Sequence, residues 1–556
     1  MNNKLLLTII FCWTSLTFSF AQENTVGLLS YNVDKVYEGY NLIFPHRQPN
    51  ILLLDNCGEL VHMWEGPEGT VPGNTAYLQP DGNLICTRRP NITTADPIFA
   101  GGGGATVEIR SWDNELLWEY TKNDAEGRLH HDIAIKDNGN ILMIEWEFMS
   151  REDAIQAGRD TALLAENEVW PERIIEVNMD KEIVWQWRAQ DHLIQDFDST
   201  KDNFGVISEH PGKINFNYDT NAAKADWLHA NAIDYQEERG QILLSIPQFD
   251  EVWIIDNTTT TAEAASTFGG RANRGGEIMY RWGNDFAYGA DTLGSNQFHY
   301  QHDVQWVDDF ISPSHPDFGK IAVFNNRIGA DFSAVSFIDP GWDMYKWRYS
   351  KNTDDTWAPE SPYREFTHPD PQAMYSTGLS GIQALANGNY LVNSGRQGYA
   401  FELTPDDEIV WEYVTPITGG VAATQGDTLA LNANLTFRMT RLPVDYPAFE
   451  GRDLSPIGFV ELEPNEDYCD RLVPVANLTR YPYNLSIAPN PSSGWMAIEF
   501  DYAAEVNFVV FDILGRPVTE FSGMGARKFV DLSDLQAGIY FLQINGGETQ
   551  RFVIEK

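Results

Sequence analysis

The chain has 556 residues, a formal net charge of −42 and an aromatic content of 13%, including 17 Trp. Such an acidic surface excludes nucleic acid as the main partner, because phosphate backbones bind basic surfaces. The length exceeds what a single core usually serves, and the aromatic content favours a large β protein over a disordered one.

The first 21 residues have the features of a secretory signal peptide. Lys4 supplies a positive charge, an apolar segment follows, and Ser19-Phe20-Ala21 is a small-x-small cleavage site. No later apolar run is long enough to span a bilayer. We therefore expect residues 1–21 to be removed and the protein, without a transmembrane segment, to be secreted or held at the cell surface after export through the periplasm.

Three cysteines remain after removal of the signal, which carries Cys12. Cys57 and Cys86 lie in the first strands of the mature chain, and Cys469 lies far downstream. A disulfide between Cys57 and Cys86 and buried free thiols are both compatible with this spacing.

One pattern of strands and turns recurs between about residues 50 and 442. It consists of an inner strand, a Gly-Asn type turn, an apolar strand, a strand ending near Asp, and a strand carrying Trp. Repeats of this length with four strands each are typical of a β-propeller. The Trp-bearing strands are expected at Leu116–Trp118, Ile183–Trp185, Tyr280–Trp282, Tyr345–Trp347 and Ile409–Trp411.

A further unit is divided between the two ends of this region. Its outer strands are expected at Ile51–Asp55 and Leu60–Trp64, and its inner part at Leu435–Arg438. Joining both ends in one unit closes a ring without an exposed edge. The sequence therefore predicts an all-β fold in which residues 22–482 form a six-bladed β-propeller.

Long connections interrupt the repeats, and we interpret them as lids or rims around a site. The Gly-rich segment Gly101–Gly104 has no Lys and is interpreted as a flexible loop, because a phosphate-cradling loop of the P-loop type requires that Lys. The connections cover roughly residues 147–171, 188–225, 258–275 and 349–377.

Three histidines occupy the same position of the repeated unit. His131 lies eight residues before the turn glycine Gly139, and His229 and His302 directly precede the equivalent strands. Because inner strands line the channel of a propeller, we expect these side chains to lie on one ring around its axis. Asn74 and Ser380 occupy the position in two other units.

A ring of imidazoles is compatible with two kinds of chemistry. Three histidines are a usual ligand set for zinc, and the Asp that follows His131 and His302 would then act behind the ligands. Alternatively, one histidine is a nucleophile and its neighbours bind an anionic group in transfer. Each histidine is also compatible with an ordinary buried core role.

The repeat region resembles the bacterial arylsulfate sulfotransferases that do not use a phosphoadenosine donor. This resemblance implies a six-bladed propeller that moves a sulfuryl group from a phenolic sulfate ester to a phenolic acceptor through a sulfated histidine, without metal or cofactor. The stretches that carry it include residues 76–84, 130–133, 226–231, 281–284, 301–306, 324–326 and 410–413.

Carried over by motif, the resemblance assigns the nucleophile to His302. His131, preferred to its neighbour His130, and His229 would bind the sulfuryl oxygens or handle the phenol proton. Asn231 and Asn326 are expected to be substrate-binding neighbours of the site.

The sequence departs from the family at one important position. An arginine is expected on the strand after the second histidine motif, where this chain has Pro247 and Gln248. Glutamine cannot reproduce the bidentate fork with which arginine holds sulfate. Arg327 is the substitute that we select, with Arg396 and Arg438 as alternatives. A secreted binding propeller without chemistry, and then a His-ligated metal enzyme, are the competing hypotheses.

The composition changes after about residue 483. Ala488–Gly494 reads as a linker, and a small all-β unit follows. Residues 483–556 resemble the C-terminal sorting domain of the type IX secretion system, which implies a small β-sandwich read by the secretion machinery of Bacteroidetes-like bacteria and commonly removed on export. The matching motifs are Asn490–Gly494, Leu514–Arg516, Asp531–Leu535, Gly538–Tyr540 and the terminal Lys556.

Overall fold

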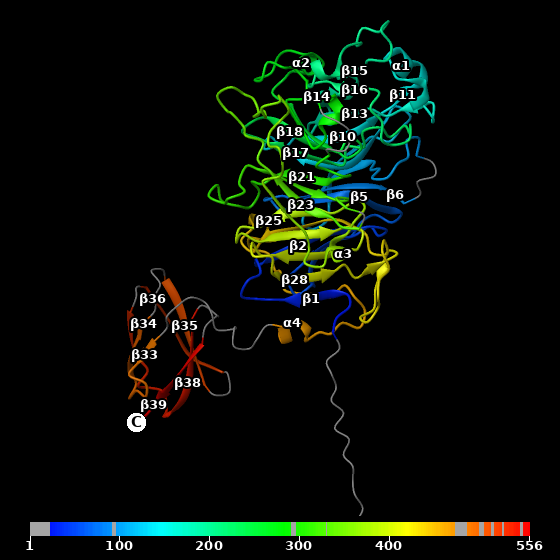
Figure 1. The fold of residues 1–556 in the computed structure, drawn as a ribbon. Coiled ribbons are helices and arrows are strands. Elements are labelled where there is room, and N and C mark those ends of the chain that lie inside the picture. Colours follow the sequence, from blue (N-terminus) through cyan, green and yellow to red (C-terminus); the bar gives the residue numbers. More distant parts are fainter. Residues whose placement is uncertain are drawn as a thin grey trace, which may run out of the picture.

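A computed structural model describes residues 23–91, 96–290, 296–329, 331–472, 486–499, 505–512, 516–524, 527–544 and 549–556 (Figure 1). The fold is nearly all-β, as predicted, and the helices are short. In the part of the chain described, no helix is long and apolar enough to cross a membrane. The expected signal peptide, residues 1–21, lies outside the described residues.

Six antiparallel sheets of four or five strands follow one another along the described chain up to residue 459. In each sheet the strands follow one another from the innermost strand outward. The first is β31 (Thr436–Pro443), β2 (Gly39–Pro45), β3 (Ile51–Leu54), β4 (Glu59–Trp64) and β32 (Gly458–Phe459); the second is β5 (Thr70–Leu78), β6 (Leu84–Pro90), β7 (Thr106–Arg110) and β8 (Leu116–Thr121); the third is β9 (Gly127–Ile135), β10 (Ile141–Glu147), β13 (Glu172–Val177) and β14 (Ile183–Arg188).

The remaining three sheets follow the same order. The fourth is β17 (Ala232–Gln236), β18 (Gln241–Ile246), β19 (Glu251–Asp256) and β20 (Tyr280–Trp282); the fifth is β21 (His302–Trp306), β22 (Ile321–Asn325), β23 (Ala334–Ile338) and β24 (Arg364–Phe366); the sixth is β25 (Gly381–Ala384), β26 (Tyr390–Ser394), β27 (Tyr399–Leu403), β28 (Ile409–Val414) and β1 (Gly27–Tyr31).

The inner strands contact one another in chain order. β5 contacts β9, β9 contacts β17, β17 contacts β21, and β21 contacts β25. β25 and β26 contact β31 of the first sheet, which in turn contacts β5. The first sheet thus lies between the second sheet and the sixth.

The first sheet contains strands from both ends of the region, as the sequence predicts for the divided unit. The inner strand β31 pairs with β2, with Gly39 opposite Pro443. The strands that were not predicted include β2 itself and β1, which pairs along the outer edge of β28. Both strands precede residue 50, where the recognisable repeat begins. They were not recognised because neither is followed by the Gly-Asn turn that marks the other units.

One predicted outer strand is wrong. Tyr345–Trp347 lies outside the sheets, and the outer strand of the fifth sheet is β24, in which Phe366 pairs with Val335. An insertion separates β23 from β24. Trp347 in this insertion matches the sequence pattern of an outer strand but does not pair with the sheet.

The repeated tryptophan has a structural reason in the other units. The indole N–H is a hydrogen-bond donor, and in these units it finds its acceptor in the neighbouring sheet. These bonds tie each outer strand to the next sheet in the series. They join Trp64 to Ser111 O (3.2 Å), Trp118 to Met179 O (2.9 Å), Trp185 to Thr259 Oγ1 (3.2 Å), Trp282 to Pro359 O (2.7 Å) and Trp411 to Asn56 O (2.8 Å).

Buried aliphatic side chains fill the spaces between neighbouring sheets. Ile85 of the second sheet packs with Met143 of the third, and Ile254 of the fourth packs with Val323 of the fifth. Burial of this apolar surface, at about 25 cal/mol per Å², is the main force that holds the sheets together.

Two of the long connections pack against each other. Arg159 is fully buried, donates to Asp219 (2.7 Å) and lies over the Trp227 ring (5.2 Å). Their short elements, with those of the other connections, are β11 (Met149–Ser150), α1 (Arg151–Gln156), η1 (Thr161–Leu163), β12 (Glu168–Val169), η2 (Ala189–His192), β15 (Leu193–Ile194), η3 (Ile207–Glu209), β16 (Ile214–Asn215), α2 (Thr261–Ala264), η4 (Asp285–Tyr288), α3 (Pro371–Met374), β29 (Ile417–Thr418), β30 (Val421–Ala422) and η5 (Pro447–Phe449).

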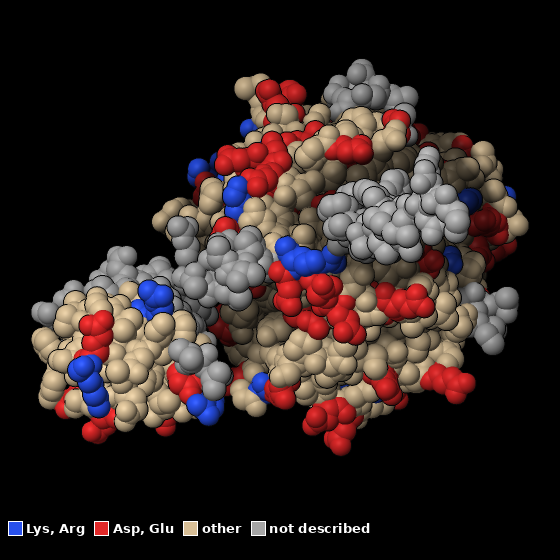
Figure 2. Space-filling model, turned by 90° about the horizontal axis from the view of Figure 1, so that it is seen from below, with Lys and Arg blue, Asp and Glu red and all other residues tan. Residues whose placement is uncertain are grey.

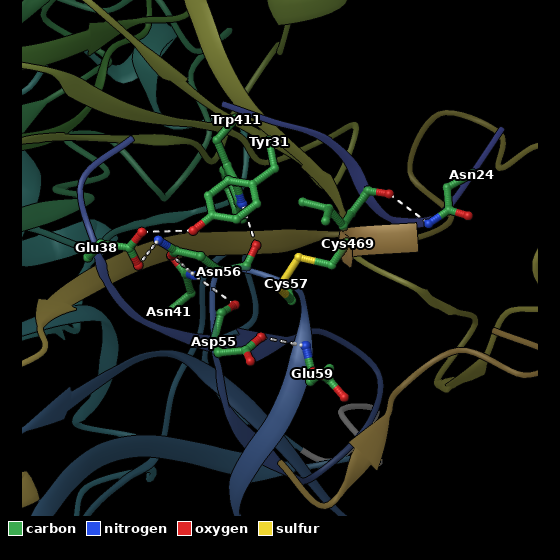
Figure 3. The surroundings of a disulfide bond; sticks show 11 residues. Asn24, Tyr31, Glu38, Asn41, Asp55, Asn56, Cys57, Glu59, Trp411 and Cys469 are labelled. Atoms are coloured by element: carbon green, nitrogen blue, oxygen red, sulfur yellow. Dashed lines mark hydrogen bonds between the residues drawn. A yellow bond between two sulfur atoms is a disulfide. The ribbon is translucent and has the colours of Figure 1, made fainter. Parts of the chain in front are cut away.

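A disulfide joins Cys57 to Cys469, with the Cα atoms 5.5 Å apart (Figure 3). The compatible pairing of Cys57 with Cys86 is therefore wrong, and Cys86 is a buried free thiol on β6. Cys57 lies in the turn between β3 and β4, where α4 (Tyr468–Leu472) packs beside β1. The bond anchors the last described residues before position 473 to the first sheet.

Removing this disulfide should strongly destabilise the fold. It closes a loop of 412 residues, and a cross-link of such a long loop stabilises by about 4–5 kcal/mol. The variant with Cys57→Ser and Cys469→Ser should melt several degrees lower than the oxidised wild type. The reduced wild type should have the same melting temperature as the variant. Equal melting temperatures for oxidised wild type and variant would contradict a stabilising role.

The C-terminal unit has two sheets that share one core. Met496 and Ile498 from one sheet pack with Phe508 and Leu542 from the other. The first sheet is β33 (Ser486–Ala488), β34 (Trp495–Glu499) and β37 (Arg527–Asp531); the second is β36 (Pro517–Met524), β35 (Glu505–Phe511), β38 (Gly538–Ile544) and β39 (Thr549–Ile554).

Residues 488–494 are not a linker, contrary to the prediction, because Ala488 pairs with Ala497 and the following residues are bonded to other parts of the unit. The N–H of Ser492 donates to Val553 O (2.9 Å), and the N–H of Leu532 donates to Gly494 O (2.7 Å). Gly494 has a φ of 118°, and a Cβ there would lie 2.5 Å from Cα of Ser533. The motif therefore binds the last strand to the 531–535 loop. Leu514 and Gly515 lie outside the described residues.

Candidate active site

The inner strands bulge at the predicted ring position. In the β9–β10 pair, the register steps from Leu129 to Ile133, so His131 leaves the ladder. In the β5–β6 pair it steps from Pro72 to Ala76, which places Asn74 in the equivalent bulge. A bulge re-aims a side chain that would otherwise alternate between the faces of a strand.

Backbone strain gathers at these bulges and strand ends. Positive φ values occur at His131 (51°), His229 (57°), Asp303 (53°) and Ser380 (91°). Such conformations of residues other than Gly cost about 1–3 kcal/mol each and persist where the surrounding structure enforces them. Their grouping marks this end of the inner strands as a candidate site.

The three predicted histidines are all buried and come together near Phe437 of β31. The rings of His131 and His229 are 4.6 Å apart. The rings of His131 and His302 lie 6.3 Å and 6.4 Å from the Phe437 ring. Gly102 covers the His131 ring so closely that a Cβ would lie 1.9 Å from its Nε2. The Gly101–Gly104 segment is therefore packed against β9 at the site.

The hydrogen bonds of His302 define its tautomer. Asn326 donates both N–H groups to carbonyls, of Ser376 (2.9 Å) and Leu379 (3.0 Å), so its Oδ1 faces His302. Nδ1 of His302 donates to that oxygen (2.8 Å), and no described residue bonds Nε2. Burial lowers the pKa of His302 to about 3. The ring is therefore neutral, with a free lone pair on Nε2.

His229 has the opposite environment. Its Nδ1 bonds to Oδ2 of Asp226 (2.6 Å), at the end of the connection between the third and fourth sheets. Burial by itself lowers the pKa of His229, but the charge and hydrogen bond of Asp226 and the charge of Glu172 raise it overall. His229 therefore holds a proton more readily than the nearby His302 does.

His131 belongs to a buried chain of hydrogen bonds. Its Nδ1 lies 2.8 Å from Nδ1 of His130, whose Nε2 lies 2.8 Å from Oε2 of Glu172. Oε1 of Glu172 accepts the N–H of Ala230 (2.8 Å). Burial raises the pKa of Glu172 and lowers those of His130 and His131.

Glu172 and Asp226 were missed from the sequence. Glu172 opens a strand that also contains Arg173 and Glu176, so its charge gives no local signal for its role. Asp226 precedes His229 by three residues within a long connection. Neither position follows from the repeat.

The Asp residues after His131 and His302 hold the inner strands together. Asp132 and Asp303 form ion pairs with Arg438 (2.8 Å and 2.6 Å). They also accept backbone N–H groups of the next sheet, from Ile233 (3.2 Å) and Ile382 (2.8 Å). Two carboxylates thus occupy Arg438, which argues against it as the sulfate ligand.

The two other candidate arginines lie beside His302 and Tyr300. The guanidinium carbon of Arg327 is 3.8 Å from the Tyr300 ring centre, and its Nε donates to Thr377 O (2.9 Å). A Cβ on Gly378 would lie 3.3 Å from Nη2 of Arg396 and 3.7 Å from Cε1 of His302. Arg396 and the nucleophile candidate therefore face one small space.

The remaining predicted positions support the backbone. Asn231 is fully buried and donates to the carbonyl of Gln301 (2.8 Å), directly before His302. Pro247 and Gln248 form the turn after β18, and Gln248 O accepts the hydroxyl of Thr220.

Among the described residues, no group of three His, Cys, Asp or Glu side chains is arranged to hold a metal ion. The donor atoms of His131, His229 and His302 have separate partners instead: a second histidine, a carboxylate and an amide. The alternative of a three-histidine zinc site has no geometric support in this part of the chain.

Successive four-stranded sheets with histidines at their inner edge define a β-propeller-like protein with an imidazole-based candidate site. The chain belongs to the arylsulfotransferase (ASST) family, whose model matches residues 42–417. The model of the secretion system C-terminal sorting domain matches residues 486–555. Both resemblances seen in the sequence are confirmed, and the sorting domain implies secretion or a cell-surface location.

None of the curated proteins matches the chain. Similar solved structures include a protein of unknown function from Bacteroides caccae (10% identity, 73% of this chain and 99% of that chain, TM-score 0.37). A streptogramin B lyase (13%, 76% and 96%, 0.34) and virginiamycin B lyase from Staphylococcus aureus (12%, 76% and 100%, 0.32) are also similar.

Proposed function

We propose that the protein is a secreted arylsulfate sulfotransferase that uses His302 as its nucleophile and needs no cofactor. Family membership supports sulfotransfer, and one observation carries the assignment: the hydrogen bond to Asn326 leaves Nε2 of His302 unprotonated. We further propose that the six sheets are the blades of a propeller covering residues 22–482. The C-terminal residues 483–556 would form a sandwich-like sorting domain.

The first half-reaction transfers the sulfuryl group to the enzyme. Nε2 of His302 attacks the sulfur of a phenolic sulfate ester, an N–S bond forms, and the S–O bond to the aryl group breaks. The departing phenolate takes a proton from His229, whose pKa the neighbouring Asp226 raises. Asn326 keeps the proton on Nδ1, so the sulfated ring retains a hydrogen bond to an uncharged amide.

The second half-reaction returns His302 to its initial state. An acceptor phenol gives its proton to His131, its oxygen attacks the sulfur, and the N–S bond breaks. The proton then passes from His131 to His229. The rings of these two histidines are 4.6 Å apart. The buried chain through His130 to Glu172 holds the His131 ring in position for this step.

The sulfuryl oxygens need positive groups around them. We assign this role to His229 and to Arg327, which lies over the Tyr300 ring beside His302. Each such donor typically contributes a factor of about 100–1000 in rate. Asn231 and Asn326 would act on the substrate through the residues they hold, Gln301 and His302.

Parts of two long connections form the border of the site. One supplies Asp226 to His229, and the other supplies the carbonyls that orient Asn326 and Arg327. We propose that these connections form the rim through which the aryl groups enter.

The mature protein should release the phenol of a chromogenic aryl sulfate continuously only when a phenolic acceptor is present. Without acceptor, release should stop after about one equivalent, because the sulfated histidine is not resolved. Treatment with a chelator should not change the rate. No release under any condition would favour the binding propeller, and activity that depends on a stoichiometric metal would favour the zinc enzyme.

A further inference from the structure

Four arginines leave the sheets at the end that carries the histidines. Each follows or ends the second strand from the centre, close to where that strand pairs with the start of the inner strand. Because the fifth, sixth, first and second sheets are consecutive neighbours, the four positions form an arc. The arginine arc consists of Arg327, Arg396, Arg47 and Arg89, in that order of sheets.

Carboxylates act on the arginine arc only from a distance: Asp96 acts on Arg89, and Arg327 acts on Asp250. None of the four forms an ion pair with a described residue, whereas Arg438 pairs with two aspartates and Arg128 with Asp96. Acidic side chains are instead spread over the surface, with few basic ones among them on the face shown in Figure 2. Unpaired guanidinium groups in a chain of net charge −42 create a local field that attracts anions.

The arginines act on common neighbours, which shows that they face one region. Burial lowers the pKa of Arg396, and the charge of Arg327 lowers it further. Burial also lowers the pKa of His46 to about 4, with additional contributions from Arg89, Arg47 and Arg396. The region therefore extends from His302 across the sixth sheet to the first and second.

Two buried side-chain nitrogens of this region have no partner among the described residues. These are Nε of Arg396 and Nε2 of His46, which lies directly before Arg47. Buried polar groups in folded proteins are almost always hydrogen-bonded, so each of these nitrogens needs a water or a bound ligand as its partner. An oxyanion would satisfy both the hydrogen-bonding capacity and the charge.

We propose that the arginine arc beyond Arg327, formed by Arg396, Arg47 and Arg89, binds a second anionic group on the aryl substrate. The preferred donors or acceptors would then be phenolic compounds that carry a further sulfate, sulfonate or carboxylate besides the reacting group. Arginine forks hold all of these oxyanions in a bidentate manner. The identity of the first anion rests on the proposed function, but the second site does not require transfer.

The test uses aryl sulfonates, whose C–S bond cannot be transferred. In calorimetric titrations, a naphthalene disulfonate should bind the wild type about tenfold or more tightly than the monosulfonate, because hydrogen bonds to charged groups are among the stronger ones. The preference should weaken at high salt, since salt screens exposed charges. Arg47→Gln and Arg396→Gln, made separately, should each reduce it severalfold.

Arg271→Gln is the matched control. Arg271 is an exposed arginine on the connection that follows β19, where it lies over the Trp347 ring and outside the arginine arc. It should keep the full preference. Equal binding of the two sulfonates, or a preference that survives in Arg47→Gln and Arg396→Gln, would overturn the proposal. Arg47 is exposed, so its variant should remain folded. An arginine-dependent preference without any sulfuryl transfer would support the second site and refute only the proposed activity.

Discussion

Replacing His302 with Asn should abolish sulfuryl transfer while the protein stays folded. Asparagine fills much of the same space but has no basic nitrogen to attack sulfur. Loss of a nucleophile typically lowers the rate by a factor on the order of 10⁴–10⁶. Initial rates with an aryl sulfate and a phenol measure this effect, and a thermal melt checks the fold.

A trapping experiment adds a direct measurement of the intermediate. Wild type incubated with donor alone, digested and analysed by mass should show an acid-labile sulfated peptide that contains His302. His210 is exposed on the connection between the third and fourth sheets, so His210→Asn is a suitable control and should retain full activity. Wild-type turnover in His302→Asn, or a sulfated peptide from elsewhere in the chain, would disprove the assignment.

Deleting residues 483–556 should prevent export and leave the protein inside the cell. The C-terminal match to the secretion sorting domain carries this expectation. In protein recovered from the medium, the region 486–555 should be missing, because such domains are commonly removed on export. Immunoblots of cell and medium fractions, with mass spectrometry of the secreted form, provide the measurement.

Two point variants test whether the folded sorting domain is what the machinery reads. Gly494→Val would place a side chain against Cα of Ser533, so it should reduce export. Ser493 is exposed beside it, and Ser493→Ala should be exported normally. Normal export of the deletion variant, with an intact C-terminus in secreted wild type, would argue against a sorting role.

The repeat made much of the fold predictable. Alternating strands, Gly-Asn turns and a recurrent Trp act locally or between adjacent sheets, so each unit carries its own signal. The prediction of strands failed where a unit departs from the repeated pattern. The insertion before β24 carries a Trp that resembles the outer-strand signal, and β1 and β2 lack the turn that would have revealed them.

Long-range pairings were not predictable in the same way. Cys57 meets Cys469 across 412 residues, because β1 and α4 both pack near the β3–β4 turn. Likewise, residues 490–494 have a linker-like composition but bind β39 and the 531–535 loop. In both cases the partner lies far along the chain, and composition carries no information about it.

By itself the sequence determined the all-β class, the family and the three histidines, because a repeat brings the same position of each unit to the same place. Only the tertiary structure decided what each histidine can do. Protonation depends on the second partner of each ring: the Asn326 amide for His302, the Asp226 carboxylate for His229, and His130 with Glu172 for His131. Those partners come from other strands and connections, whose positions folding alone brings together.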